Sequence, residues 1–160
     1  MRRQPAPPEP TTGSQATTRA TRENLGFLLA KASQRWNEML YEAFRRAGYR
    51  DVRPAHGSIL IPLFEEDGLR MGELAKRSRL SKQTMTALIR IMKQRKLILR
   101  RRDPVDARAS RIYLTPRTRR FKPVVERILR EMDESVEARL TSGRYAQVTA
   151  ALKVVMNLTR

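Results

Sequence analysis

Residues 81–116 read SKQTMTALIRIMKQRKLILRRRDPVDARASRIYLTP, and the spacing of their apolar side chains changes partway along. In the first part, apolar side chains recur at offsets of three, four and seven, which predicts a helix with one buried face. These side chains are Met85, Leu88, Ile89 and Met92. Ser81 is a suitable N-cap for this helix because its hydroxyl can accept a backbone N–H from the first turn.

The second part of the stretch predicts a β-hairpin. Two short apolar runs, 97–99 and 112–114, flank a polar segment with turn-forming residues. The loop between them contains Asp103, Pro104 and Asp106, and it is too long and too charged for a two-residue turn. We therefore expect a basic hairpin that projects into solvent as a wing, with both aspartates exposed.

Upstream of residue 81, a short helix is expected over 71–78, followed by the tight connection Arg79-Leu80. Two helices joined by so short a turn indicate a helix-turn-helix. Before them, Pro54 suits the first turn of a helix that runs to Phe64 and is broken by Asp67 and Gly68.

Long amphipathic helices are expected on either side of this central region. Apolar residues recur at helical spacing from 22 to 49 and again after Thr115-Pro116, where Pro123 should still lie in irregular first turns. A last helix follows residues 141–143. Residues 1–20 hold four Pro among Thr, Ser, Gly and Gln, with almost no apolar side chain to bury, and predict a disordered arm. The fold class is thus mainly α with a small β-hairpin wing (α+β), a winged helix-turn-helix.

The composition points to a polyanionic partner. The chain has 160 residues, enough for one domain, and its 34 Lys and Arg against 16 Asp and Glu leave a net charge of +18. It has no signal peptide and no long apolar run, so we expect a cytoplasmic protein that does not use a membrane. Without cysteine, and with His56 as the lone histidine, no metal, cofactor or catalytic constellation is expected. We do not expect an enzyme.

The positive charge is concentrated on the predicted helix-turn-helix and hairpin. Residues 76–120 contain sixteen Lys or Arg, and the acids among them are Asp103 and Asp106 alone. A single basic zone is what a DNA footprint requires. A membrane-binding protein would instead carry its basic residues along one face of an amphipathic helix.

The exposed face of the helix after residue 81 should enter the major groove, which admits a helix. Gln83 can bond adenine through two hydrogen bonds, and Arg90 or Lys82 can reach guanine or phosphate. On the wing, Arg108 is placed to enter the narrow minor groove, where negative potential attracts arginine. The full set of predicted DNA-binding residues is Ser81, Lys82, Gln83, Thr84, Thr86, Arg90, Arg101, Asp106 and Arg108.

Polar residues on the outer face of a helix also occur simply because that face is solvated. Two other functions fit the charge: a nonspecific chromosome-coating protein and an RNA-binding winged-helix protein. Both would show little preference for a palindromic duplex, whereas a sequence-specific DNA-binding regulator would show a strong one.

Three segments together resemble the MarR family of winged-helix regulators: Glu73-Leu74-Ala75, residues 80–100, and Asp103-Pro-Val-Asp106-Ala-Arg108 closing on Leu114-Thr115. The resemblance extends over most of residues 22–158. It implies that Arg108 inserts into the minor groove and that Asp106 helps to orient nearby arginines. Lys96 and Thr118 stand where the family often has glycine.

The resemblance also implies a homodimer that binds a pseudo-palindromic operator as a repressor and is released by a small aromatic or phenolic ligand. In this organisation residues 21–160 form one domain, with 21–50 and 116–160 as dimerisation helices and 53–115 as the DNA-binding lobe. Candidate interface residues are Leu25, Leu28, Leu29, Leu152, Val155 and Met156. Candidate ligand residues are Trp36, Met39 and His56, each of which also suits a plain packing role.

Overall fold

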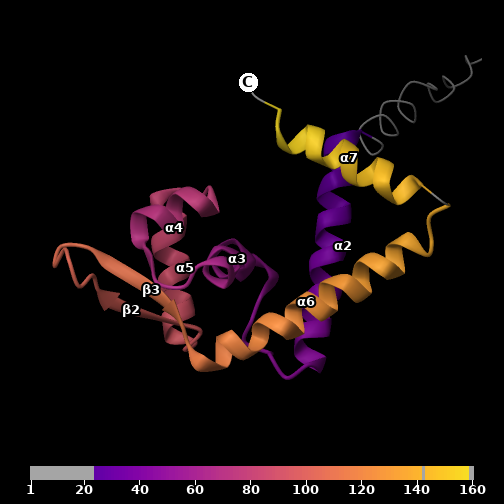
Figure 1. Cartoon of the computed structure of the whole chain (residues 1–160). Helices are drawn as coiled ribbons and strands as arrows, with labels where there is room; N and C mark the ends of the chain where they lie inside the picture. Colours follow the sequence, from indigo (N-terminus) through magenta and orange to yellow (C-terminus); the bar gives the residue numbers. More distant parts are fainter. Residues whose placement is uncertain (1–23, 142, 159–160) are drawn as a thin grey trace, which may run out of the picture. The chain divides into compact units, whose positions relative to one another are not determined.

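The computed structural model describes residues 24–141 and 143–158 (Figure 1). The chain forms two compact units, one up to Met39 and the other from Leu40 onward. Helix α2 (Leu25–Arg46) contributes to both units. The second unit continues with η1 (Pro54–His56), α3 (Gly57–Glu65), β1 (Leu69–Arg70), α4 (Met71–Ser78), α5 (Lys82–Gln94), β2 (Ile98–Arg102), β3 (Ser110–Leu114), α6 (Pro116–Glu137) and α7 (Arg144–Met156).

The helix-turn-helix is formed by α4 and α5, as the sequence predicts. Helix α4 is followed by Arg79, which has the left-handed conformation with φ of 49° and turns the chain sharply. Ser81 then caps α5, because its Oγ accepts the backbone N–H of Thr84 at 3.1 Å. The turn between the two helices is therefore short and closed by a side-chain cap.

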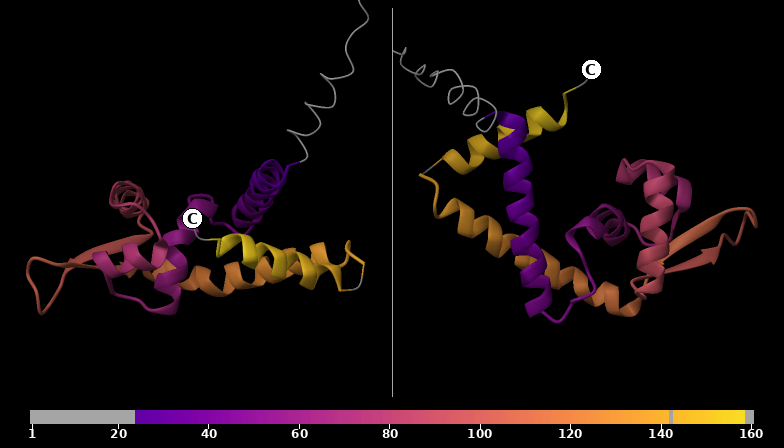
Figure 2. Two further views of the ribbon diagram at one scale, coloured as in Figure 1. Left: turned by 90° about the horizontal axis from the view of Figure 1, so that it is seen from above. Right: turned by 180° about the vertical axis from the view of Figure 1, so that it is seen from behind.

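The wing is the hairpin of β2 and β3, whose register pairs Ile98 with Leu114. Its loop reaches beyond α4 and α5 (Figure 2). In the described residues the sheet also contains β1, in the antiparallel order β1-β3-β2, with Leu69 opposite Ile112. Strand β1 is not predicted from the sequence, because a strand of two residues has no measurable periodicity.

A single apolar core joins these elements. It packs α3, α4 and α5 against the inner face of the sheet and the start of α6. Its most deeply buried side chains include Ile59, Leu63, Leu69, Leu74, Met85, Met92, Leu97, Ile98, Ile112 and Phe121. Phe121 also meets the Phe44 ring edge-on, with centroids 4.9 Å apart, so the last turns of α2 are fixed to α6.

Two aspartates outside the wing connect elements that are distant in sequence. Asp51 accepts both Nη atoms of Arg117 at 2.6 Å. Asp67 Oδ1 accepts the backbone N–H of Gly68 at 3.0 Å and of Leu114 at 2.8 Å, and its Oδ2 accepts Nη2 of Arg119 at 2.7 Å. The first turns of α6 are thereby joined to the loops that precede the sheet.

Helix α6 starts as predicted but corrects one expectation. Thr115 caps it by accepting the N–H of Thr118, and Pro116 occupies the first turn. Pro123, expected in irregular first turns, lies inside the regular helix. Proline there removes the hydrogen bond to the carbonyl of Arg119. Arg119 is exposed, so water can replace that donor.

Candidate nucleic-acid interface

The outer face of α5 presents the polar side chains that the sequence predicts for it. Ser81, Lys82, Gln83, Thr84, Thr86 and Arg90 are all exposed. Met85, Ile89 and Met92 face the core on the other side of the helix. Four of the selected residues line one shallow groove of about 530 Å³ together with Ala87: Lys82, Gln83, Thr86 and Arg90.

Some side chains on this face of α5 form hydrogen bonds within the protein, and others do not. Ser81 and Thr84 hydroxyls lie 2.9 Å apart and complete the helix cap, while Thr86 donates its hydroxyl proton to the carbonyl of Lys82 at 2.8 Å. Within the described part of the chain, the amide of Gln83 and the charges of Lys82 and Arg90 have no side-chain partner. The long side chains of Lys82, Gln83 and Arg90 are thus the ones available to bind another molecule.

The wing places Arg108 on an exposed, ordered turn. The Asp106 carboxylate accepts the backbone N–H of Arg108 at 3.0 Å, and the Asp106 carbonyl accepts the N–H of Ala109 at 2.9 Å. Asp106 therefore shapes the backbone that carries Arg108. Arg101 is exposed on β2, and its guanidinium lies 5.5 Å from the ring centre of Tyr113.

Asp103 corrects the expectation that both wing aspartates are exposed turn formers, since its side chain is fully buried. Its Oδ2 accepts Nε of Arg70 and Nε of Arg111, both at 2.8 Å. Its Oδ1 accepts the backbone N–H groups of Val105 and Asp106. The bond from Arg70, followed by the N–H of Val105, holds the pKa of Asp103 well below its usual range. Asp103 is thus the permanent anion that fixes the base of the wing loop.

An Asp-Pro turn in the sequence does suggest local backbone capping by Asp103. The arginines that pair with it do not follow from that pattern. Arg70 is 33 positions away, and only the folded sheet brings it to the wing.

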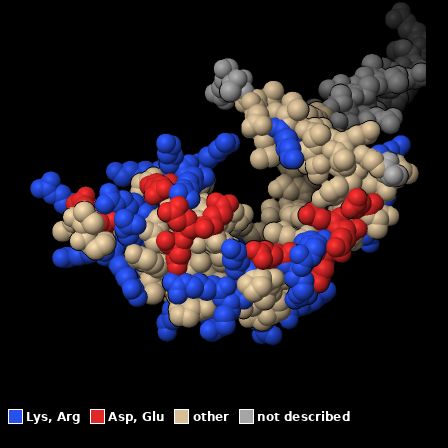
Figure 3. Space-filling view, viewed as in Figure 1, with Lys and Arg blue, Asp and Glu red and all other residues tan. Residues whose placement is uncertain are grey.

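The basic zone remains largely unneutralised in the folded protein. Of the sixteen basic residues between 76 and 120, ion pairs engage Arg77, Arg111, Arg117 and Arg119. Figure 3 shows Lys and Arg side chains around the wing and α4, a group of acidic side chains beside α3 and α4, and further acidic side chains along α6. A field of this kind attracts a polyanion to one surface of the molecule.

The residues predicted to bind a ligand lie in different units. Trp36 and Met39 lie on α2 in the unit that ends at Met39, and His56 lies in η1 of the other unit. His56 is buried, and its Nδ1 accepts the backbone N–H of Arg53 at 3.1 Å. It therefore has a structural role as a cap, and the ligand role of the three residues stays a prediction.

The apolar residues predicted for dimerisation are poorly buried within the chain. Leu25, Leu28, Leu152 and Met156 are exposed by 39% to 72%, and Leu29 and Val155 are half-buried. Helix α7 contributes no buried residue at all in its described span. In the described residues no helix is both long and apolar enough to cross a membrane.

In this chain a short turn precedes an exposed basic helix, and a basic hairpin lies beside that helix. These features define a winged helix-turn-helix protein, a class that docks a helix in the major groove of DNA. Residues 53–110 match the family model described as the MarR family. This match covers the helix-turn-helix and most of the wing, about a third of the chain, and over that span the chain is similar to the MarR family. No curated protein matches the chain.

Solved structures share the fold over nearly their whole length. A probable transcriptional regulator from Pseudomonas aeruginosa is 21% identical with a TM-score of 0.72, and the match covers 84% of this chain and 98% of that one. The MepR–DNA complex of S. aureus is 22% identical, with a TM-score of 0.70 and coverage of 83% and 96%. The PcaV regulator of Streptomyces coelicolor, in complex with its natural ligand, is 20% identical, with a TM-score of 0.69 and coverage of 86% and 95%. At these identities the similarity establishes the fold alone.

Proposed function

We propose that this protein is a sequence-specific regulator that binds double-stranded DNA as a homodimer and represses transcription in the cytoplasm. The observation that carries the proposal is the set of Lys82, Gln83 and Arg90 along one groove of α5, which have no side-chain partner among the described residues, beside a wing that presents Arg108. Glutamine and arginine are the side chains that read adenine and guanine through paired hydrogen bonds.

The proposed domain organisation assigns residues 53–115 to the DNA-binding lobe and residues 21–50 and 116–160 to dimerisation, with residues 1–20, which lie outside the described part, as an arm. Exposed leucine and methionine on α2 and α7 support it, because soluble monomers rarely leave extended apolar surfaces open to water. A twofold dimer would place two copies of α5 about one helical turn of DNA apart on a pseudo-palindromic operator.

A small aromatic or phenolic effector is the proposed signal for release, with Trp36, Met39 and His56 as candidate contacts. The ligand-bound PcaV structure, which shares the fold, supports the presence of an effector in principle. Such a ligand acts by binding one of two conformations more tightly than the other.

The experiment that tests the DNA-binding function is selection of bound duplexes from a random pool, followed by affinity measurements at several salt concentrations. Wild type is compared with Gln83→Ala and Arg108→Ala. Arg130→Gln is the matched control, since Arg130 is an exposed arginine on α6 outside the basic zone.

We expect a palindromic site preferred over scrambled DNA by roughly a thousandfold or more. Arg108→Ala and Gln83→Ala should each weaken that site by about tenfold, the value of one good groove contact. Arg130→Gln should leave the affinity unchanged. Salt-sensitive binding without sequence preference would instead identify a chromosome-coating or RNA-binding protein and would overturn the proposal.

A further inference from the structure

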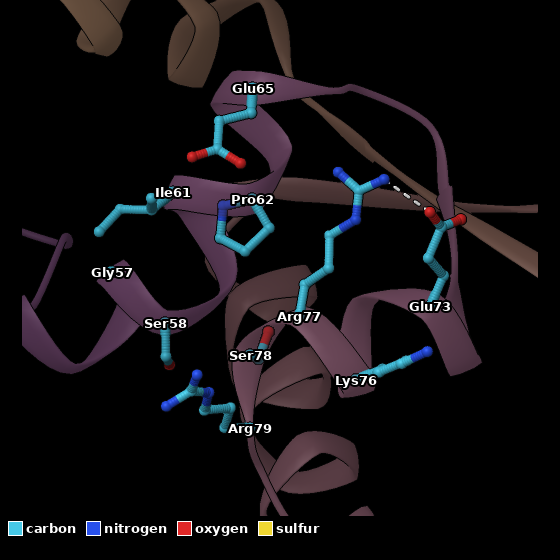
Figure 4. A pocket seen from close by; sticks show the side chains of 10 residues that line it. All are labelled: Gly57, Ser58, Ile61, Pro62, Glu65, Glu73, Lys76, Arg77, Ser78 and Arg79. Atoms are coloured by element: carbon cyan, nitrogen blue, oxygen red, sulfur yellow. Dashed lines mark hydrogen bonds and ion pairs between the residues drawn. The ribbon is translucent and has the colours of Figure 1, made fainter. Parts of the chain in front are cut away.

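The groove along α5 differs in charge from the cleft between α3 and α4. That cleft is lined by Glu65 and Glu73, and Figure 4 shows the guanidinium of Arg77 bonded to the Glu73 carboxylate. Among the described residues, those that line the groove on α5 include no acid. An acidic wall repels the phosphates of DNA, so the groove on α5 suits a DNA surface better than the cleft does.

The groove follows one stripe of α5. Its lining residues at 83, 86, 87 and 90 are three, four and seven positions from the first, which places them on the same face of the helix. Gln83 and Arg90 mark the two ends, about 10.5 Å apart along the helix axis. Both ends of the stripe are therefore polar, with Thr86 and Ala87 between them.

Thr86 offers a methyl group to the groove because its hydroxyl is engaged elsewhere. The hydroxyl donates its proton to the backbone carbonyl of Lys82, with the two oxygens 2.8 Å apart, and is thereby turned toward the helix. The side chain as a whole is exposed and lines the groove. The γ-methyl is thus the branch of Thr86 that remains for contact with another molecule.

Ala87 extends this apolar surface. It is exposed, it lines the same groove, and its side chain is a single methyl group. Such a short side chain lets the edge of a base approach the helix closely. The middle of the stripe is therefore a small apolar patch, formed by Thr86 and Ala87, between the polar ends Gln83 and Arg90.

We propose that Thr86 and Ala87 recognise the C5-methyl group of a thymine in the operator. Thymine presents this methyl group in the major groove, and alanine and the threonine methyl are side chains that contact it. The thymine lies within about three base pairs of the base that Gln83 contacts, since the stripe is about as long as three steps of roughly 3.4 Å. The inference rests on the proposed function and names a base that the middle of α5 reads.

The test is a thymine-to-uracil scan of the best duplex from the selection, with one thymine of one half-site changed at a time. Uracil lacks the methyl group but keeps the hydrogen-bonding edge of thymine. The affinity of the full chain for each duplex gives a thymine-to-uracil ratio at each position.

Three variants show which group is responsible for the ratio. Thr86→Ser keeps the hydroxyl and removes the methyl, whereas Thr86→Val keeps a methyl and replaces the hydroxyl by a second one. Thr149→Ser is the matched control, because the hydroxyl of Thr149 also donates to the carbonyl four residues earlier, that of Tyr145 on α7. A ratio of affinities is unaffected by a change in dimerisation alone.

We expect uracil at one thymine of the half-site to weaken binding by about fourfold, the value of one buried methyl group. Thr86→Ser should lower this ratio to less than about twofold, and Thr86→Val and Thr149→Ser should keep it. A ratio that is unchanged in Thr86→Ser or lost in Thr86→Val overturns the inference.

The selection and the scan separate this inference from the proposed function. A preferred duplex in which no thymine depends on its methyl group contradicts the inference alone. If no preferred duplex is selected, the proposed function fails and the inference fails with it.

Discussion

Arg111 Nε donates to Asp103 Oδ2 at 2.8 Å, and this bond fixes the base of the wing loop on a fully buried carboxylate. The same oxygen also accepts Arg70, so a neutral side chain at this position leaves two arginines without their anion. Wing geometry therefore depends on the charge of Asp103 and not only on its size.

Asp103→Asn should lower the urea midpoint of unfolding and weaken operator binding by roughly tenfold, because Arg108 is then no longer held in place. Glu134→Gln is the control, since Glu134 is an exposed acid on α6. Chemical denaturation and DNA titration check the prediction. Equal effects of the two variants would show that the buried charge does not shape the wing.

Gly68→Ala should be more destabilising than Gly48→Ala. Both glycines have positive φ, 83° and 88°, so alanine meets backbone strain of about 1 kcal/mol at either position. At Gly68 the new Cβ would also lie 2.6 Å from Cε1 of Tyr113, whereas at Gly48 the space is open. We expect a loss of at least about 2 kcal/mol for Gly68→Ala in urea unfolding. Equal losses would mean that the Tyr113 ring moves aside freely.

Lys96→Gly should stabilise the protein. Lys96 has φ of 55° between α5 and β2, in the left-handed region that L side chains rarely adopt. Glycine removes that strain but gains freedom in the unfolded chain, so the expected net gain is about 0.5–1 kcal/mol. Lys96→Ala removes the charge and keeps the strain. If alanine gave the same gain in thermal unfolding, charge repulsion and not backbone strain would be the cause.

Stability should fall in mildly acidic solution because of His56. Burial, followed by the positive charges of Arg95 and Arg53 and opposed by Asp51, lowers the pKa of His56 from 6.5 to about 4. The unfolded chain therefore takes up the proton first. The contribution of neutral His56 is complete above pH 6.5 and is lost as the pH falls toward 4.

We expect this loss to be roughly 2 kcal/mol once solvent screening is allowed for. His56→Gln should keep the cap, because the glutamine amide can accept the N–H of Arg53 as the histidine does. Urea unfolding at pH 4, 5 and 6.5 compares the two proteins. A variant with the same pH dependence as wild type would exclude His56 as the source.

Local signals in the sequence were sufficient for much of the fold. The cap at Ser81, the span of α4 and the start of α6 after Thr115 were all predicted correctly, because each depends on residues within one helical turn. The long helix expected over 22–49 ends earlier, at Arg46, because Gly48 turns the chain with a φ of 88° and the N–H of Tyr49 then donates to the carbonyl of Phe44 at 2.9 Å.

The exposed residues of α5 could be predicted from the sequence, whereas the contacts that hold the wing could not. The exposed positions of α5 follow from its helical period, and they were selected correctly as exposed residues. The burial of Asp103 depends on Arg70, and β1 depends on pairing with β3 across some forty residues of chain. Such long-range partners leave no trace in a local pattern.

Asp67 gives the wing and α6 a common attachment. One of its oxygens holds the last residue of β3, Leu114, and the other holds Arg119, five positions further along the chain. The junction between them therefore cannot bend like a free linker, because the same carboxylate fixes both sides of it. A movement of the first turns of α6 would therefore also displace the end of β3, and with it the base of the wing.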